Sequence, residues 1–208
     1  MPVPTSSEAR VAAREHVLRA ARACFLASGV RRTTMEAVAR SAGTSRQVVY
    51  KLFLGRRELV EAAVAERIAE LADELATGRW GGGATVEIFT SVSVAVIEGI
   101  RGDHELGVLL GDGSPLTLHE ALWMESVAQR GLRFWLPWFE RARSEGLLRD
   151  DLSDSDLSDW LQTIYASIIL RRNMAPGDER ALIERFVLTS LAMASRPDLP
   201  RLSEPIGS

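Results

Sequence analysis

The chain has one cysteine, Cys24, among its 208 residues, so it cannot form an internal disulfide. Cys24 lies in an apolar stripe, which favours a small packed side chain over a reactive thiol. No run approaches the roughly 18 consecutive apolar residues that a membrane span requires. The polar start MPVPTSSEAR lacks the apolar core of a signal peptide. We therefore expect a cytoplasmic protein with no membrane partner.

The sequence also lacks the motifs that mark common enzymes and metal sites. It contains no phosphate-binding loop, Gly-x-Ser-x-Gly elbow, Rossmann fingerprint or zinc-ligand spacing. The acidic run that begins at Asp150 has neither the turn glycine nor the distal glutamate of an EF-hand, and Ser153 and Asp156 have capping-box spacing instead. His104 and His119 have no neighbouring partner residue in the sequence. We expect no catalytic residues, no cofactor and no metal site.

Sustained alternation of apolar and polar residues, the mark of a half-buried strand, is absent, and so is any internal repeat. Apolar residues recur every three or four positions, as they do on one face of a helix. The predicted helices cover residues 8–28, 34–42, 45–53, 56–76, 84–101, 103–110, 116–144, 155–173 and 176–194. We expect Pro137 to kink or break the seventh of them near Leu136. The predicted fold is all-α, with about nine helices.

Lysine is nearly absent, and the basic residues are unevenly distributed. Residues 1–60 contain eleven Lys and Arg against four Asp and Glu, a net charge of +7, whereas residues 61–208 contain fourteen against twenty-four, a net charge of −10. Lys51 is the only lysine in the chain. A basic N-terminal module on an acidic body is the pattern expected when one end of a protein faces phosphate.

The segment Met35–Leu52, MEAVARSAGTSRQVVYKL, has the layout of a helix-turn-helix. Thr33 and Glu36 have capping-box spacing just before the first helix. Ala39 supplies a small residue where the helices cross, and Gly43 supplies the turn residue. The apolar residues expected to hold the pair together are Val38, Ala42, Val49 and Leu52. A second helix built this way delivers polar side chains to the major groove of DNA.

Gln47 and Lys51 are four residues apart and share one face of this second helix. Gln can pair with adenine, and Lys can reach guanine or a phosphate. Val48 can meet a thymine methyl group, and Tyr50 has the reach for a phosphate oxygen. Three arginines, Arg46, Arg56 and Arg57, stand at helix N-termini, where a cation is unfavourable unless an anion joins it. Their placement indicates an anionic partner.

The stretch Arg14–Val60 resembles the N-terminal module of the TetR family of bacterial transcriptional repressors, over about a quarter of the chain. The matching parts are Leu18–Gly29, Thr33-Thr34-Met35, Val38-Ala39, Ala42-Gly43-Thr44-Ser45, Tyr50-Lys51-Leu52-Phe53 and Arg56 with Leu59. Arg56 stands where the family usually has lysine. This chain has Leu54 where the family commonly has proline or glycine, and Gln47 where it often has glycine or alanine. Gln47 thereby adds a side chain that can read a base.

This resemblance implies which residues contact DNA. Thr34, Tyr50 and Arg56 would hold phosphates, and Arg46, Gln47 and Lys51 would face bases. The complete set of predicted base contacts is Arg46, Gln47, Val48 and Lys51. The complete set of predicted phosphate contacts is Thr33, Thr34, Ser45, Tyr50 and Arg56.

The resemblance also implies a C-terminal helical domain that dimerises through its last two long helices and holds a small ligand. The predicted dimer residues, with ordinary packing inside the chain as the alternative, are Leu161, Ile164, Ile168, Ile183, Phe186, Val187, Ser190 and Leu191. The predicted effector-pocket residues, with plain core as the alternative, are Phe89, Trp123, Met124, Val127, Trp135, Trp138, Phe139 and Tyr165. Polar contacts to the ligand are expected from Glu125, Gln129 or Arg133.

We divide the chain into a flexible tail (1–8), a helix-turn-helix domain (9–55), a helical effector-binding and dimerisation domain (56–195) and a second tail (196–208). The predicted protein is a homodimer that binds a palindromic operator in double-stranded DNA and leaves it when a small hydrophobic or aromatic effector binds. Alternatives are an activator, or a regulator that responds to a protein partner. An architectural DNA-binding protein has little use for the long acidic body.

Overall fold

The computed structural model describes residues 6–78, 80, 83–171, 174 and 177–192, and within them it is helical, as predicted. The elements are α1 (Ser6–Ser28), α2 (Met35–Ser41), α3 (Arg46–Leu52), α4 (Arg56–Ala76), α5 (Thr85–Gly102), α6 (His104–Leu109), α7 (Leu118–Leu122), α8 (Glu125–Ser144), α9 (Asp154–Leu170), α10 (Asp178–Leu182), the π-helical turn η1 (Ile183–Val187) and α11 (Leu188–Leu191). The last three run on from one another as one C-terminal helix. Residues 1–5 and 193–208, which include the predicted C-terminal tail, lie outside the described residues.

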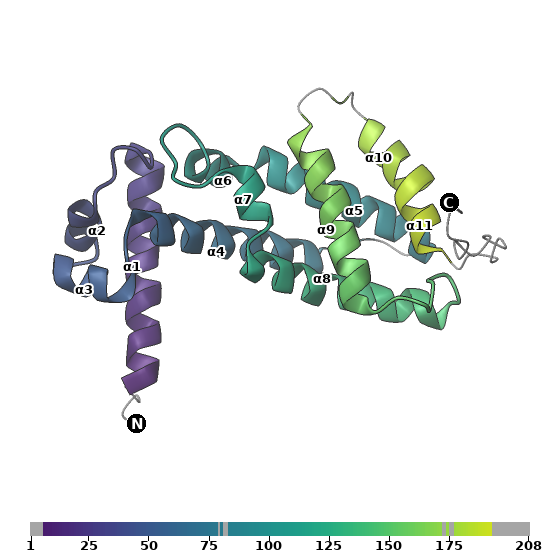
Figure 1. Ribbon diagram of the computed structural model, residues 1–208, viewed down its shortest axis with the longest axis horizontal. Coiled ribbons are helices and arrows are strands. Elements are labelled where there is room, and N and C mark those ends of the chain that lie inside the picture. Colours follow the sequence, from purple (N-terminus) through teal and green to yellow (C-terminus); the bar gives the residue numbers. More distant parts are fainter. Residues whose placement is uncertain (1–5, 79, 81–82, 172–173, 175–176, 193–208) are drawn as a thin grey trace, which may run out of the picture.

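Helices α1, α2 and α3 form a small head at one end of an elongated molecule, and α4 leads from this head into the body (Figure 1). The head closes around buried side chains from all three helices, among them Phe25, Val38 and Val49, and the first half of α4 adds Leu59 and Val64 to the same core. One helix therefore belongs to the head core at its start and packs against the body helices α5 and α8 further on.

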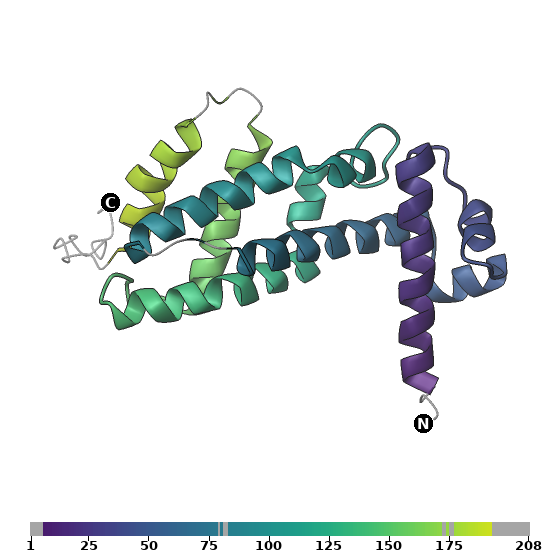
Figure 2. The same cartoon turned by 180° about the vertical axis from the view of Figure 1, so that it is seen from behind.

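The body is a layer of long helices, in which α5 and α8 flank the second half of α4 and α9 crosses them (Figures 1 and 2). Its core is centred on Trp135, Phe139, Leu161 and Tyr165, all buried. The C-terminal helix packs on α5 at the end farthest from the head. The body therefore holds a second hydrophobic core, separate from that of the head.

Two helix boundaries differ from the sequence prediction. Pro137 lies inside α8 without ending it, and the break falls earlier, at Trp123 and Met124 between α7 and α8. A proline removes one backbone hydrogen bond, but α8 packs against both α4 and α9, so its buried face holds the helix together. At the other end of the chain, residues 6–8, expected to be flexible, form the first turn of α1.

Helix capping was predicted correctly at α9 and wrongly at α2. Ser153 and Asp156 form the expected capping box at the start of α9. At α2 the capping residue is Thr34, whose hydroxyl oxygen accepts a hydrogen bond from the Ala37 amide, rather than Thr33. Thr33 is buried, and its hydroxyl donates to the carbonyl oxygens of Cys24 and Gly29. Because the two threonines are adjacent, the sequence spacing could not decide which of them caps α2.

An arginine-centred ion-pair network joins the head to the body. Arg22 of α1 donates to Glu105 of α6 at 2.6 Å, to Glu66 of α4 at 2.7 Å and to Glu70 of α4 in a two-point pair. Arg67 of α4 continues the network by bonding Glu70. We call these five residues the Arg22 network. Because three helices contribute to it, it fixes where α1 sits relative to α4 and α6.

Candidate nucleic-acid interface and ligand pocket

The turn between α2 and α3 has the geometry that a helix-turn-helix requires. Gly43 adopts a left-handed φ of 59°, and the Thr44 amide donates to the Ala39 carbonyl at 2.9 Å. The imidazole of His16 in α1 lies 2.9 Å from the Ala42 carbonyl oxygen and fastens the turn to the first helix. The angle between α2 and α3 is therefore held by backbone geometry and by α1.

Helix α3 buries one side and exposes the other. Val49 is fully buried against the head core, with Leu52 half-buried beside it. The exposed side chains are those predicted to meet DNA, namely Arg46, Gln47, Val48, Tyr50 and Lys51. All four predicted base-contacting residues thus lie on the solvent side of one seven-residue helix.

The Ser45 hydroxyl and the Arg46–Tyr50 pair are polar groups on this surface that suit a phosphate. Ser45 caps α3, its hydroxyl oxygen accepting from the Val48 amide, and its hydroxyl hydrogen stays available to an acceptor. The guanidinium of Arg46 lies 3.5 Å from the Tyr50 hydroxyl oxygen and 5.3 Å from the centre of its ring. This contact orients both side chains on the exposed surface.

The start of α4 offers a second place for an anion. Gly55 precedes the helix and provides no side-chain cap, so the first turn keeps unsatisfied amide groups at the positive end of a 21-residue helix. Arg56 is exposed at this end, and its guanidinium donates to the Arg31 carbonyl at 3.3 Å. Free amide groups at a helix N-terminus and an exposed arginine in the first turn together form a suitable phosphate site.

Two residues expected at the DNA surface have other roles. Thr33 is buried in the turn after α1, so its hydroxyl, bonded to two carbonyl groups, is not available to phosphate. Arg57, one residue after Arg56, faces the body: it donates to Glu61 at 2.8 Å, to the Pro115 carbonyl at 2.8 Å and to Glu120 at 3.0 Å. Arg57 is therefore a link between head and body.

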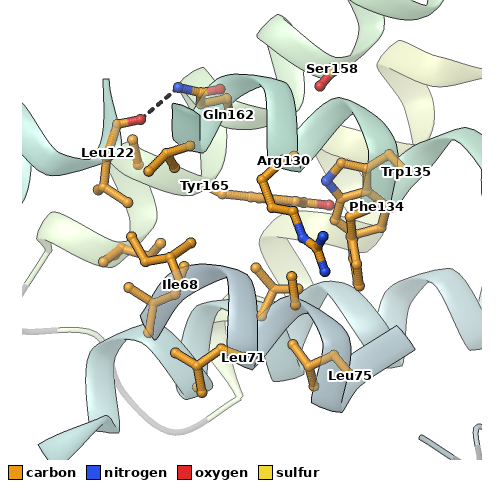
Figure 3. Close-up of a pocket in the computed structure, with 18 residues that line it drawn as sticks. Ile68, Leu71, Leu75, Leu122, Arg130, Phe134, Trp135, Ser158, Gln162 and Tyr165 are labelled. Carbon is orange, nitrogen blue, oxygen red and sulfur yellow. Dashed lines mark hydrogen bonds between the residues drawn. The ribbon is translucent and has the colours of Figure 1, made fainter. Parts of the chain in front are cut away.

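A cavity of about 100 Å³ lies in the body where α4, α5, α8 and α9 meet. Its walls are mostly apolar, with Ile68, Leu71 and Leu75 of α4 on one side and Phe134 and Trp135 of α8 on another (Figure 3). Leu122, the last residue of α7, also lines the cavity. The second half of α4 thus forms one wall of the pocket, while its first residue stands at the proposed phosphate site.

The pocket contains a few polar groups, and sequence analysis missed several of them. Arg130 extends from α8 over Leu71 and Leu75 and donates to Asp73 and to the Ala69 carbonyl. Gln162 of α9 donates to the Leu122 carbonyl at 2.6 Å (Figure 3). The only sequence signal for Gln162 was a lone amide beside the apolar stripe of α9.

Tyr165 is a buried wall residue of the same pocket. Its hydroxyl donates to the Ser93 hydroxyl oxygen at 2.7 Å, and Ser93 in turn donates to the Phe89 carbonyl. Burial raises the pKa of the Tyr165 phenol above its ordinary value, so this group remains a neutral hydrogen-bonding group.

The predicted pocket residues divide into three groups. Val127, Trp135 and Tyr165 line the pocket. Phe89, Trp138 and Phe139 line a second apolar cavity, of about 170 Å³, between α5, α8 and the C-terminal helix. Trp123 is exposed, with its ring tilted against that of His119, and Met124 packs against the head core, so neither forms part of a pocket wall. The expected polar contacts Glu125, Gln129 and Arg133 do not line the pocket either, and Gln129 bonds Glu125 on the surface.

Most of the predicted dimer residues are buried within the chain itself, as the alternative interpretation had it. Leu161, Ile168, Ile183, Val187 and Leu191 belong to the body core. Ile164 and Ser190 are partly buried. Phe186 alone among the eight is exposed, and the same two helices also expose Trp160 and Leu170. The apolar periodicity of α9 and the C-terminal helix therefore identified the sides of these helices that face the chain's own core.

Comparisons with known proteins agree with this architecture. Residues 17–63 match the family model of bacterial regulatory proteins, tetR family. An uncharacterised HTH-type transcriptional regulator of Mycobacterium tuberculosis is 33% identical over 87 residues, which span 42% of this chain and 44% of the relative. The chain therefore matches less than half the length of this curated relative.

The similarity to solved structures extends over nearly the whole chain. The transcriptional repressor QsdR of R. erythropolis, from the TetR family, superposes with a TM-score of 0.67 at 19% identity, covering 93% of this chain and 100% of that one. FadR of Thermus thermophilus, a TetR-family repressor in complex with lauroyl-CoA, gives 0.61 at 22% identity, covering 88% and 97%. At these identities the similarity shows the fold.

No helix among the described residues combines the length and the apolar character needed to cross a membrane. The head carries the exposed α3 surface and the left-handed turn glycine, its sequence matches the family model, and the whole described chain has the corresponding fold. The head is thus similar in sequence to the bacterial regulatory proteins of the tetR family, and the chain as a whole has the fold of the solved TetR-family structures.

Proposed function

We propose that the protein is a dimeric, ligand-responsive transcriptional repressor that binds an operator through α3 and leaves it when a small molecule enters the body pocket. The observation that carries the DNA-binding role is the exposed surface of Arg46, Gln47, Val48 and Lys51 on α3. The uncapped start of α4 with Arg56 lies beside this surface and supplies the phosphate contact.

Each side chain of this surface has a distinct proposed role. Arg46, Gln47 and Lys51 read base edges in the major groove, and Val48 contacts a thymine methyl group. Thr34, Ser45, Tyr50 and Arg56 hold phosphates and set the register of the head on the duplex. The positive charge of residues 1–60 favours this approach, and the acidic body is repelled by DNA.

The pocket supports a small hydrophobic or aromatic effector, because its walls are apolar and it contains only a few polar groups. Its volume of about 100 Å³ is below the roughly 300–1,000 Å³ of sites for drug-sized ligands. A drug-sized effector therefore has to separate α4 from α8 and α9 in order to fit. Since α4 begins at Arg56, such a separation alters the position of the head, and the ligand shifts the population away from the DNA-binding state. A pocket with mostly apolar walls between packed helices favours a small molecule over a protein partner.

A second copy of the chain is the proposed partner for the exposed apolar side chains of α9 and the C-terminal helix. Trp160, Leu170 and Phe186 are large and exposed there, and the Trp160 indole nitrogen donates to the Ser190 hydroxyl at 2.9 Å, which brings the two helices together. Burying such side chains in a two-fold interface is favourable. Two heads related by this symmetry can read half-sites about 34–36 Å apart.

Substitutions in the head test the assignment of roles. We expect Gln47→Ala and Lys51→Ala each to relax base preference at one position, at a cost of about 1–3 kcal/mol for the preferred sequence. Arg56→Ala should instead weaken binding to all sequences by a similar factor, because a phosphate carries no sequence information. Selection from a random DNA library with each variant measures both effects. The roles are wrong if Arg56→Ala changes base preference while Lys51→Ala does not.

The dimer proposal is tested at Phe186, whose side chain is 66% exposed in the single chain. Phe186→Glu places a charge in the proposed interface and should yield monomers in sedimentation experiments, without changing the helical circular dichroism spectrum. Val11→Glu is the matched control, because Val11 is also exposed but lies on α1. A Phe186→Glu protein that stays dimeric would place the interface elsewhere.

A further inference from the structure

The structure points to a second connection between pocket and head, running through α7. We infer that Gln162, Leu122, Glu120 and Arg57 form a relay by which occupation of the pocket changes the position of the DNA-binding head. The inference rests on the proposed function, and it assigns positioning roles to residues that do not themselves contact DNA.

The relay begins at a polar contact inside the pocket. The Gln162 amide nitrogen donates to the Leu122 backbone carbonyl at 2.6 Å, and both residues line the cavity (Figure 3). A ligand that offers a better acceptor to this amide, or that occupies the space of the Leu122 side chain, breaks the bond or moves Leu122. Leu122 is the last residue of α7, so either event acts directly on that helix.

Helix α7 bridges the two hydrophobic cores. Ala121 is fully buried in the core shared by the head and the first half of α4, whereas Leu122 belongs to the core of the body. The helix is only five residues long, and a capping box between Thr117 and Glu120 closes its first turn. A short, capped helix anchored in both cores moves as a unit, so a displacement of Leu122 reaches Glu120.

Glu120 transmits this movement to the start of α4. One carboxylate oxygen accepts from the Thr117 amide and hydroxyl at 2.8 Å, and the other accepts from Arg57 at 3.0 Å. These bonds lower the pKa of Glu120 to about 2, so it is ionised at neutral pH. Arg57 also donates to the Pro115 carbonyl just before α7. Arg57 adjoins Arg56, the proposed phosphate contact, so releasing Glu120 loosens the head at the residue where it meets DNA.

The test uses two single variants and their combination, with DNA affinity measured on a sequence selected by the wild-type protein. Gln162→Met keeps the size of the side chain and removes the donor to Leu122. Glu120→Gln retains the capping box, because glutamine also suits that position, and it removes the charge that holds Arg57. Gln129→Met is the matched control for the first variant, since Gln129 is exposed on α8 and its amide donates to its neighbour Glu125 on the surface.

We expect each single variant to bind DNA roughly fivefold or more weakly, and the double variant to bind no more weakly than the weaker single one, because both interrupt one path. Electrostatics alone predicts the opposite change in DNA affinity for Glu120→Gln, since removing a negative charge near DNA strengthens binding. Unchanged or tighter binding by Glu120→Gln, or additive losses in the double variant, would overturn the relay.

Hydrogen exchange on the DNA-free protein separates this inference from the proposed function. If the relay exists, Gln162→Met should speed exchange of the α7 amides and of the amides of residues 56–59, and Gln129→Met should not. If the wild-type protein selects no DNA at all, the proposed function fails, and the exchange result alone then decides the relay. Faster exchange confined to α9 in Gln162→Met would contradict it.

Discussion

Replacing Trp135 by alanine is expected to lower the free energy of unfolding by about 3–5 kcal/mol, the usual cost of truncating a buried aromatic side chain. Trp135 is 4% exposed, and its ring lies 5.2 Å from that of Phe89, 4.8 Å from that of Phe134 and 5.7 Å from that of Tyr165, between ring centres. Removing it opens the pocket towards the second cavity, because Phe89 lines that cavity. Urea unfolding followed by circular dichroism measures the loss.

The matched control is Trp123→Ala, which removes the same side chain from a position 47% exposed to solvent. We expect it to cost less than about 1 kcal/mol, since few contacts are lost at an exposed position. The assignment of Trp135 to the pocket wall, and of Trp123 to the surface, would be wrong if the two variants were equally destabilised.

Replacing Arg22 by methionine is expected to lower the free energy of unfolding by about 2–3 kcal/mol, somewhat less than the 3–5 kcal/mol for fully buried pairs, because solvent screens part of the network. The Arg22 side chain is 15% exposed and pairs with three carboxylates, which the substitution leaves facing one another. Arg40→Met removes an exposed pair with Glu36 and should cost less than about 0.5 kcal/mol. Equal losses in the two proteins would show that the Arg22 network does not join head and body.

The same network sets a pH dependence. Hydrogen bonds from Arg22, followed by those from Arg67, lower the pKa of Glu70 to about 2 from an ordinary value of 4.5. A lowered pKa in the folded state stabilises the protein fully above the unfolded value, and this contribution is lost as the pH falls from about 4.5 towards 2. Unfolding measured across this range should therefore show a steeper acid loss in the wild type than in Arg22→Met.

The head was largely predictable from sequence because its structure depends on local signals. The glycine at position 43, the apolar residues Val38 and Val49 and the start of α4 at Arg56 all stand where the pattern placed them. Local spacing reaches its limit where two neighbouring residues can play one role. Thr34 caps α2 while Thr33 is buried, and of the two consecutive arginines it is Arg57 that bonds Glu120 of the body.

The body was predictable as helices but not as surfaces. Periodicity identifies the apolar side of α9, yet it cannot tell whether that side meets its own chain or a second copy, and Leu161 and Ile168 proved to be core. Aromatic content likewise marked the region around Trp123 and Trp135 without separating the exposed ring from the buried one. The contact between Gln162 and Leu122 was not predictable from sequence, because the two residues meet only when α7 and α9 pack together.

The salt dependence of DNA affinity tests the proposed DNA-binding role most directly. For a selected duplex, we predict that the logarithm of the association constant falls linearly with the logarithm of salt concentration, with a slope of about −1.8 or steeper. Arg56 of each of two heads neutralises one phosphate, at about −0.9 each. In a dimer, Arg56→Ala removes both contacts and should flatten the slope by about 1.8. A response that is flat in the wild type, or unchanged by Arg56→Ala, would contradict a head that docks on phosphate at the start of α4.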